Sequence, residues 1–516
     1  MFTDSCQSFG DDRGNFLEKT PSDQRRIEII QFKCVLVDFF VAKGVFGLAT
    51  TANSVPYRLV RDATGRVYRM GESPRDIMGY SRLVMLFLPW IGMMLASTLE
   101  YGWGAASATV AHEYHWSLTT AFWNYSVYVL FEAGVSYFNG RFRERATWWS
   151  PKRAMLVGGI LVAAAYFFLA HSAAPWISYA GYAALGGIGS GLAYSTCVNM
   201  VAKWFPEKKG WRTGFVDGGW AYGAVPFIIL YATSFNVHDF VSILYLTGGI
   251  LGAGLVIISF WFKDPPRSWW PAGVDPIRWS EDRRAWSLKR NPPAMRQLTT
   301  AEMWRTHQPK WMILEFLFIA GTSLFGVGFY YPFAVAMHLG AVAIIAGATG
   351  FAFTDGTGRP LVGLLSDLIS RRWAEVVVYS ILGLTTLGSL LSGMAHSPVL
   401  FVIFALLSGG TSGSLFVLNP LMVSDYYGTD HQTENYGTIY AAKVVGGFYG
   451  GVVAAYLITG TSSYTWAFVV ASLMALAAAG IAAAFFQRPT EAELRRAMGD
   501  EEFERQAQVA EPLSTA

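Results

Sequence analysis

The 516-residue sequence is poor in the side chains on which metal proteins and most enzymes depend, with three cysteines and eight histidines. Cys6, Cys34 and Cys197 have no metal-ligand spacing and cannot all pair with one another, so no disulfide framework is indicated. No nucleophile stands at a typical spacing from a base. We therefore expect no metal, no cofactor and no enzymatic activity.

Charge is scarce as well. Only 15% of the residues are charged, whereas 53% are hydrophobic and 16% aromatic, a composition typical of a membrane protein with lipids as partners. The net charge of +3 is too balanced for a nucleic-acid surface, so nucleic acid is not an expected partner. Before Arg25 the chain is polar and acidic and lacks the order of a cleavable signal peptide. Insertion is expected to begin from internal helices.

Long apolar runs are what the sequence has in abundance. About twelve runs of about 20 apolar residues lie between positions 81 and 486, each long enough to cross a hydrocarbon core. Because only closed hydrogen-bonding structures are stable in lipid, we expect an all-α membrane protein. The expected transmembrane helices are 82–110, 118–139, 153–171, 176–202, 213–234, 240–262, 311–338, 341–365, 374–395, 398–423, 435–459 and 464–486.

Basic residues gather in alternate loops between these helices. They are Arg141, Arg143, Arg145, Lys152 and Arg153 in the second loop, Lys203, Lys208, Lys209 and Arg212 in the fourth, and Arg371 and Arg372 in the eighth. The loops at 111–116 and 171–176 contain no lysine or arginine. By the positive-inside bias, we expect a multi-pass protein of the plasma (inner) membrane with both termini in the cytoplasm. The tenth loop, which carries Asp425 and Glu434 but no cation, is the exception.

The remaining segments flank or join the apolar runs. Residues 1–81 are expected to form a cytoplasmic extension, in which 25–48 is a candidate interfacial helix and 49–80 a linker. Residues 263–310 are expected to be a cytoplasmic linker that lies along the inner membrane surface, because they mix arginines with tryptophans. Residues 487–516 are expected to be a cytoplasmic tail.

An internal repeat divides the chain into two halves. Four glycines recur at a constant offset of 223 residues, as 363 follows 140. The pairs are Gly140 and Gly363, Gly187 and Gly410, Gly214 and Gly437, and Gly223 and Gly446. Glu144 matches Asp367 in the same register. We therefore expect two pseudo-symmetric six-helix halves, 82–262 and 311–486.

Two cations stand inside apolar segments of the second half. Arg359 lies in the segment 355–372 and Lys443 in 436–447. An arginine at the centre of a spanning helix costs about 2.5–3.5 kcal/mol on insertion scales, so it normally faces a polar cavity or a counter-charge. Arginine can hold one carboxylate by two hydrogen bonds, and lysine presents a point charge to a second. The pair suits a small dianion or two monoanions; the alternative is a structural ion pair.

Aromatic side chains are candidates for the wall of such a site. We name Tyr101, Trp220, Tyr331 and Tyr440 as candidate substrate contacts. Trp220 occupies the repeat position that corresponds to Lys443, so it is expected to face the same pathway from the other half. For each of these aromatics the alternative is packing or lipid contact.

Acids within the apolar segments bear on the mechanism. Glu100, Glu132 and Asp217 lie in first-half spans, and Asp355 lies one turn before Arg359. A carrier with two unpaired cations should resist reorientation until an anion neutralises them, which favours exchange. A carrier with a protonatable acid could return empty, which favours proton symport. The alternative for each acid is a local ion pair or polar helix contact.

Each half has a glycine, an acid and basic residues in the loop after its second helix. The loops are Gly140-Arg-Phe-Arg-Glu144-Arg145 and Gly363-Leu-Leu-Ser-Asp367-Leu-Ile-Ser-Arg371-Arg372. Two six-helix halves with such loops resemble the major facilitator superfamily, although Glu144 stands where aspartate is usual. We interpret the loops as an inner gate, in which carboxylate and guanidinium groups pair in one state and separate in the other.

Within that superfamily the chain is similar to the oxalate:formate antiporter family over roughly residues 82–486. The matching stretches are Trp116-Ser-Leu-Thr, Lys203-Trp-Phe-Pro-Glu-Lys-Lys-Gly210, Gly356-Thr-Gly-Arg-Pro with Ser366-Asp367, and Tyr436-Gly through Ala442-Lys443. The resemblance implies that Arg359 and Lys443 bind the two ends of a dicarboxylate. The long amino-terminal extension is not part of the family pattern.

These observations predict a secondary transporter of small organic anions, such as oxalate or formate, that exchanges anions by alternating access between two halves. One alternative is a proton-coupled monocarboxylate symporter. A second is a membrane anion sensor that binds its ligand without transport. The sequence leaves the identity of the anion and the oligomeric state open, and a monomer is compatible with it.

Overall fold

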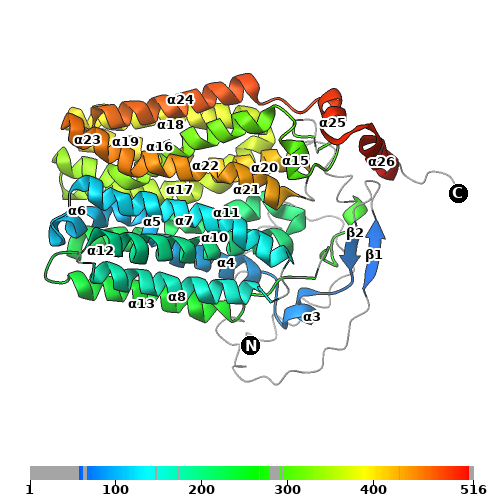
Figure 1. Ribbon diagram of the computed structural model, residues 1–516, viewed down its shortest axis with the longest axis horizontal. Coiled ribbons are helices and arrows are strands. Elements are labelled where there is room, and N and C mark those ends of the chain that lie inside the picture. The colour runs from blue at the N-terminus through cyan, green and yellow to red at the C-terminus, as the bar shows by residue number, and fades with distance from the viewer. Residues whose placement is uncertain are drawn as a thin grey trace, which may run out of the picture.

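The computed structural model describes residues 57–61, 67–145, 148–172, 174–266, 268–278, 290–292, 294–428 and 431–510. Most of these residues form long helices that run side by side in one bundle (Figure 1). The predicted interfacial helix at 25–48 lies outside the described residues.

The first half contains six helical passages, several of them built from consecutive pieces. In chain order they comprise α4 (Val84–Ala96), α5 (Thr98–Tyr101) and α6 (Trp103–Glu113); α7 (Leu118–Arg145); α8 (Pro151–Ala170); α9 (Pro175–Ser178), η1 (Tyr179–Leu185) and α10 (Gly186–Trp204); α11 (Lys209–Tyr222) and α12 (Val225–Ser234); and α13 (Phe240–Ser259). The pieces join at small residues such as Gly102 and Gly223.

The second half repeats this arrangement. Its passages comprise α16 (Gln308–Ala336); α17 (Ala341–Ile369); α18 (Arg371–Met394); α19 (Pro398–Ser412) and α20 (Leu415–Tyr427); α21 (Gln432–Tyr440), α22 (Ala442–Phe448), η3 (Tyr449–Val453) and α23 (Ala454–Thr461); and α24 (Thr465–Phe485). These helices follow the expected spans to within a few residues at most ends.

Among the described residues, nine helical stretches are long and apolar enough on their own to cross a membrane. The expected spans outside this set correspond to α7, α10 and α17. Two of them carry buried charges, Glu132 on α7 and Asp355 and Arg359 on α17. Charges on the buried faces of α7 and α17 therefore contribute to the lower hydropathy of these two helices.

The two halves meet along helices from the middle of the bundle. α11 packs along α17, and α7 packs along α22 and η3, while α8 with α13 and α18 with α24 form the outer edges (Figure 1). At the first crossing the backbones touch, because a Cβ atom on Gly218 would stand 2.5 Å from the carbonyl oxygen of Gly356. Glycine is thus required where the halves approach most closely.

A short hairpin lies at one end of the bundle, in a stretch expected to be a linker. Strands β1 (Arg58–Arg61) and β2 (Val67–Met70) pair antiparallel, with Arg58 opposite Met70. The backbone N–H of Trp270 donates to the carbonyl oxygen of Arg69 at 2.9 Å. The Trp270 ring packs edge-on against that of Tyr68, with ring centroids 4.9 Å apart. α3 (Pro74–Met78) leads from the hairpin to the first transmembrane passage.

The carboxyl-terminal helices pack at the same end as the hairpin (Figure 1). α25 (Glu491–Met498) and α26 (Asp500–Ala510) contact the connection between the halves, which includes α15 (Thr300–Met303). Arg305 donates to the carbonyl oxygen of Ala497 at 2.8 Å, and Arg296 donates to that of Phe503 at 3.0 Å. The hairpin, the connection between the halves and the carboxyl-terminal helices therefore lie together at one end of the bundle.

Candidate functional site

Arg359 lies in the middle of the bundle, where α17 meets α11 and α5. Its Nη1 donates to Asp217 Oδ2 at 2.8 Å and to the Asp217 carbonyl oxygen at 2.9 Å. Its Nε and Nη2 each lie 3.2 Å from an oxygen of Asp355, one turn earlier on α17. Tyr101 accepts from Nη2 at 3.1 Å and donates its hydroxyl proton to Asp355. The guanidinium fork is therefore occupied by two carboxylates and a phenol.

Lys443, which lies on α22, makes a corresponding set of contacts. Its Nζ lies 2.8 Å from Glu132 Oε2 on α7 and 3.1 Å from Glu100 Oε2 on α5. Tyr440 donates its hydroxyl to the other oxygen of Glu132 at 3.0 Å. The lysine is thus a point charge shared between two carboxylates. All four acids named from the sequence are brought onto the two cations.

Most of these ion pairs join one half to the other. Both cations belong to the second half, and three of the four acids belong to the first, the exception being Asp355. The phenol of Tyr101 crosses the boundary in the same direction. The cluster therefore couples the position of one half to that of the other.

Phe416, on α20, links the two cations. The Arg359 guanidinium carbon lies 5.1 Å and Lys443 Nζ 5.3 Å from the centre of this one ring. Gly413 precedes α20, and a Cβ atom there would collide with the side chains of Asp355 and Arg359. Neither residue was assigned to the site from the sequence. An aromatic ring and a glycine in an apolar run carry no signal of their position beside a charge.

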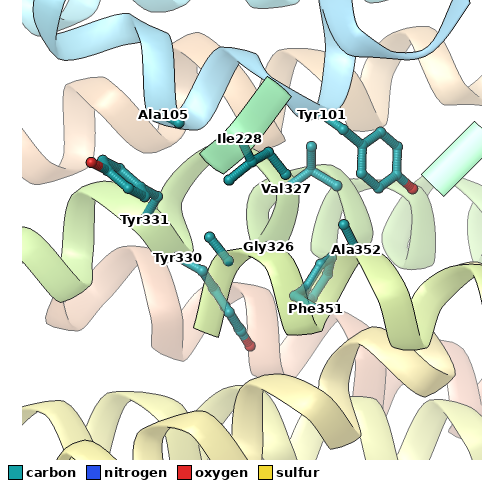
Figure 2. A pocket seen from close by; sticks show the side chains of 10 residues that line it. Tyr101, Ala105, Ile228, Gly326, Val327, Tyr330, Tyr331, Phe351 and Ala352 are labelled. Carbon is teal, nitrogen blue, oxygen red and sulfur yellow. The ribbon is translucent and has the colours of Figure 1, made fainter. Parts of the chain in front are cut away.

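The cluster is closed off from solvent. The side chains of the two cations and four acids are each at most 2% exposed. A cavity of about 10 Å³, room for about one water molecule, lies beside it, with Tyr101 and Tyr331 on its wall (Figure 2). The described structure is therefore a closed state of the bundle.

The aromatic candidates lie at different distances from the charges. Tyr101 and Tyr440 bond directly to the acids of the cluster. Trp220 is buried and packs edge-on against Tyr194, whose ring stacks on Tyr440 at 5.8 Å. Tyr331 lines the cavity on the side away from Tyr101 (Figure 2). Trp220 is thus separated from Tyr440 by the ring of Tyr194, and Tyr331 contacts the cavity rather than the charges.

The residues assigned to the gate lie at the hairpin end of the bundle. Arg371 pairs with Asp367 at 2.7 Å and with Asp425 at 3.4 Å. Arg372 donates to the carbonyl oxygen of Ala483. Gly363 and Gly140 lie within α17 and α7. The side chains of Glu144 and Arg145, at the end of α7, lie outside the described residues.

A second ion pair at this end was not identified from the sequence. Arg143, at the end of α7, lies 2.7 Å from both oxygens of Asp264, which follows α13, and Lys203 lies 3.5 Å from the same carboxylate. Burial alone would raise the pKa of Asp264, but Arg143 and Lys203 outweigh it and hold this pKa below its usual value. The basic residues of these loops were apparent in the sequence, but the acid that Arg143 contacts lies 121 residues further along the chain.

No metal site accompanies the charges. Within the part of the chain that the structure describes, no three histidine, cysteine, aspartate or glutamate side chains are placed to hold a metal ion.

Comparison with known proteins places this geometry in a family context. The family model described as Major Facilitator Superfamily matches residues 89–353 and 311–513. The oxalate:formate antiporter of Oxalobacter formigenes is 25% identical over 404 residues, which cover 78% of this chain and 91% of the relative. Monocarboxylate transporter 13 of Bos taurus is 22% identical over 65% of this chain and 74% of its own length.

Solved structures agree at the level of fold. The nucleoside transporter NupG superposes with a TM-score of 0.55 at 12% identity, and the match covers 78% of this chain and 99% of that one. At that identity the likeness concerns the twelve-helix, two-half architecture alone, which confirms the fold expected from the sequence.

Proposed function

The chain belongs to the Major Facilitator Superfamily, a family of membrane transporters rather than enzymes, and from that premise we propose that it carries small carboxylate anions across the plasma membrane. The two halves would rock about the Arg359–Lys443 cluster and expose it to each side in turn. The relatives named for oxalate, formate and monocarboxylates support carboxylates as the substrate class.

One observation carries this proposal: in the closed state, carboxylates of the protein itself hold both cations. Asp217 and Asp355 contact Arg359 as substrate carboxylate oxygens would, and Glu100 and Glu132 do the same for Lys443. A substrate carboxylate that displaced Asp217 or Glu132 would take over a geometry already built for it. It would also release the ion pairs that join the halves.

The charge balance of the cluster bears on what drives transport. Two cations face four carboxylates, so the fully ionised cluster is negative and repels an anion. Protonation of one of the acids frees its cation and weakens that repulsion. In the empty cluster both cations already have carboxylate partners, so the carrier can reorient without substrate. We therefore favour proton-coupled carboxylate symport, with Asp217 and Glu132 as proton acceptors.

Anion exchange is the second candidate. The observation in its favour is the 25% identity with an oxalate:formate antiporter over most of both chains. In this mode an anion, rather than a proton, would replace the carboxylates on the two cations during the return step. Arg359 and Lys443 would have the same role in both modes.

The proposed transport cycle also assigns a role to the gate residues and an orientation to the protein in the membrane. Arg371, Asp367 and Asp425 would hold the hairpin end together in one state and separate in the other. The hairpin and α25–α26 share that end of the bundle with the basic loops, which supports its placement in the cytoplasm.

Transport by purified protein in liposomes tests these assignments. Vesicles are loaded with oxalate, formate or lactate, or left empty under an inward proton gradient, and entry of the labelled anion is followed. Symport predicts uptake into empty vesicles, lost in Asp217→Asn and Glu132→Gln while counterflow persists. Exchange predicts uptake only with an internal anion.

Neutralised cations provide the stricter test of the site. Arg359→Gln and Lys443→Gln should abolish uptake in both modes, whereas Lys310→Gln, at the exposed start of α16, should transport as the wild type does. Wild-type activity in the first two variants would refute the site.

A further inference from the structure

A second group of buried acids lies in the second half, away from the two cations. Glu315 on α16 and Glu375 on α18 are both 0% exposed. Tyr379, one turn after Glu375, and Asn419 on α20 complete the group and are equally buried. The proposed transport cycle assigns none of these four residues a role.

The polar atoms of this group are poorly satisfied. Asn419 Nδ2 donates to Glu315 Oε2 at 3.3 Å. Glu315 Oε1, both carboxyl oxygens of Glu375, the Tyr379 hydroxyl and Asn419 Oδ1 have no hydrogen-bond partner among the described residues. The Tyr379 hydroxyl nevertheless faces Glu315 and interacts with both acids. Four buried carboxyl and amide oxygens therefore have no donor within hydrogen-bond distance, in contrast to the oxygens of Glu132, which accept from Tyr440 and Lys443.

Among the described residues, the helices packed against the pair turn no cation toward it. α19 and α24 contain no ionisable side chain, and the ionisable groups that α18, α20 and α21 turn toward the pair are the phenols of Tyr379, Tyr426 and Tyr436. The cations at the start of α18 are engaged elsewhere, Arg371 with Asp367 and Asp425, and Arg372 with the carbonyl oxygen of Ala483. When both are ionised, the carboxylates of Glu315 and Glu375 repel each other.

Two ionised carboxylates cannot share a buried site without a counter-charge, because burial removes the hydration of each and the two charges repel each other. A proton taken from water removes the charge of one carboxyl and provides a donor for an orphaned oxygen. We propose that Glu315 and Glu375 form a proton-binding site in the second half, distinct from the Arg359–Lys443 cluster, and that its occupancy changes during the transport cycle.

A path of packed rings connects this site to the cations. Phe316, next to Glu315, packs against Phe416 and Tyr440 with ring centroids 6.2 and 5.9 Å apart. Phe416 faces Arg359 and Lys443. A shift of α16 relative to α20 would therefore change both the surroundings of Glu315 and the position of Phe416. This coupling rests on the proposed transport function, whereas proton binding itself does not.

Infrared difference spectroscopy of the full-length protein tests proton binding without substrate. At neutral pH the wild type should show the C=O band of a buried protonated carboxyl, and Glu315→Gln/Glu375→Gln should lose that band. Glu501→Gln, exposed on α26, should retain it. A double variant with an unchanged band would overturn the proposal. So would loss of the wild-type band when Na⁺ replaces choline, because the pair would then be a sodium site.

Thermal stability gives an independent readout. Glutamine has the shape of a neutral glutamic acid, so Glu375→Gln should unfold at nearly the wild-type Tm. Glu132→Gln, which removes a partner of Lys443, should unfold at a lower Tm. A loss of stability in Glu375→Gln as large as in Glu132→Gln would indicate an ionised, paired Glu375 and would contradict the proposal.

Proton counting in liposomes tests the coupling. Glu375→Gln should carry one proton fewer per anion than the wild type, and Glu501→Gln should not. An unchanged ratio would refute the coupling. A wild type that carries no carboxylate would refute the proposed function instead, and the infrared result would still decide whether the pair binds a proton.

Discussion

At the scale of single residues, the two cations of the cluster are not interchangeable. The planar guanidinium of Arg359 reaches Asp217, Asp355 and Tyr101 at once through three nitrogens. The ammonium of Lys443 is a point charge between Glu100 and Glu132. The planar fork holds its partners in a fixed orientation, whereas a point charge tolerates rotation of its carboxylates.

The substitution Arg359→Lys tests this difference. Lysine keeps the charge but loses at least two of the charged hydrogen bonds, each of which contributes about 1.5–3 kcal/mol. We expect uptake to fall by about tenfold or more, since about 1.4 kcal/mol corresponds to a factor of ten. Initial rates in liposomes measure this effect. Lys443→Arg serves as the matched exchange, and equal activity of Arg359→Lys and wild type would show that charge alone suffices.

Asp264 allows a prediction about pH. Its carboxylate is bonded by Arg143 through both of its oxygens, which holds its pKa below the usual value. Such a group stabilises the fold above its unfolded pKa of about 3.9, and the contribution disappears as pH falls through the folded pKa. Asp264→Asn should therefore cost about 1–3 kcal/mol at neutral pH.

Thermal unfolding of the purified protein across a pH series measures this effect. The Tm difference between wild type and Asp264→Asn should stay constant down to mildly acidic pH and shrink only below about pH 4. Glu501→Gln is the control, because its side chain is exposed. A difference that vanished already near neutral pH would contradict the assignment.

The sequence identified the charged residues of the cluster but not which of them pair with one another. A charge inside an apolar run is conspicuous, so Arg359, Lys443 and their acids could be named. The pairings could not, since Lys443 meets Glu100 across 343 residues. Glu315 and Glu375 were overlooked, because each lies near the start of its predicted span, 311–338 or 374–395, where a charged residue is not conspicuous.

At the scale of elements, the crossing of α11 and α17 decides how closely the halves can approach. Gly218 and Gly356 stand in backbone contact, and Gly214 lies against Pro360. The crossing lies directly beside Asp217 and Arg359. Closure of the bundle and formation of this ion pair therefore occur together.

Gly218→Val should separate these helices. The new Cβ atom would stand 2.5 Å from the Gly356 carbonyl oxygen, and such overpacking typically costs about 1–3 kcal/mol. That cost falls on the closed state, so we expect transport to drop about tenfold while the protein still inserts and folds. Gly249→Val on α13 is the matched control, because a Cβ atom there meets nothing within 4 Å. Equal activity of the two variants would show that the crossing does not limit closure.

The hairpin shows where prediction of elements failed. Its strands are four residues long and rich in arginine, so their alternation is weak. Their apolar face is completed by Trp270, which lies 200 residues further along the chain than Met70. The twelve spans, by contrast, were predictable because each is apolar over its own length. Local pattern thus sufficed for the helices and not for an element stabilised by a distant partner.

At the scale of the whole molecule, the cluster holds the two halves together in the closed state. Its cations belong to one half and most of its carboxylates to the other, at positions that are at most 2% exposed. Removal of one charge strands its partners in an apolar interior, which typically costs about 3–5 kcal/mol, whereas removal of all charges together can be nearly neutral. Stability and transport should therefore respond differently to the number of charges removed.

A set of variants at the Arg359 site separates the two effects. Arg359→Gln leaves Asp217 and Asp355 without their cation, so we expect a markedly lower Tm and no transport. Adding Asp217→Asn and Asp355→Asn to Arg359→Gln removes the stranded charges and should restore most of the Tm, but no transport, because the anion has lost its ligand. Thermal unfolding and liposome uptake on the same preparations provide the comparison. A triple variant no more stable than Arg359→Gln would mean that the acids are not held by this arginine, and a triple variant that transports would place substrate binding elsewhere in the bundle.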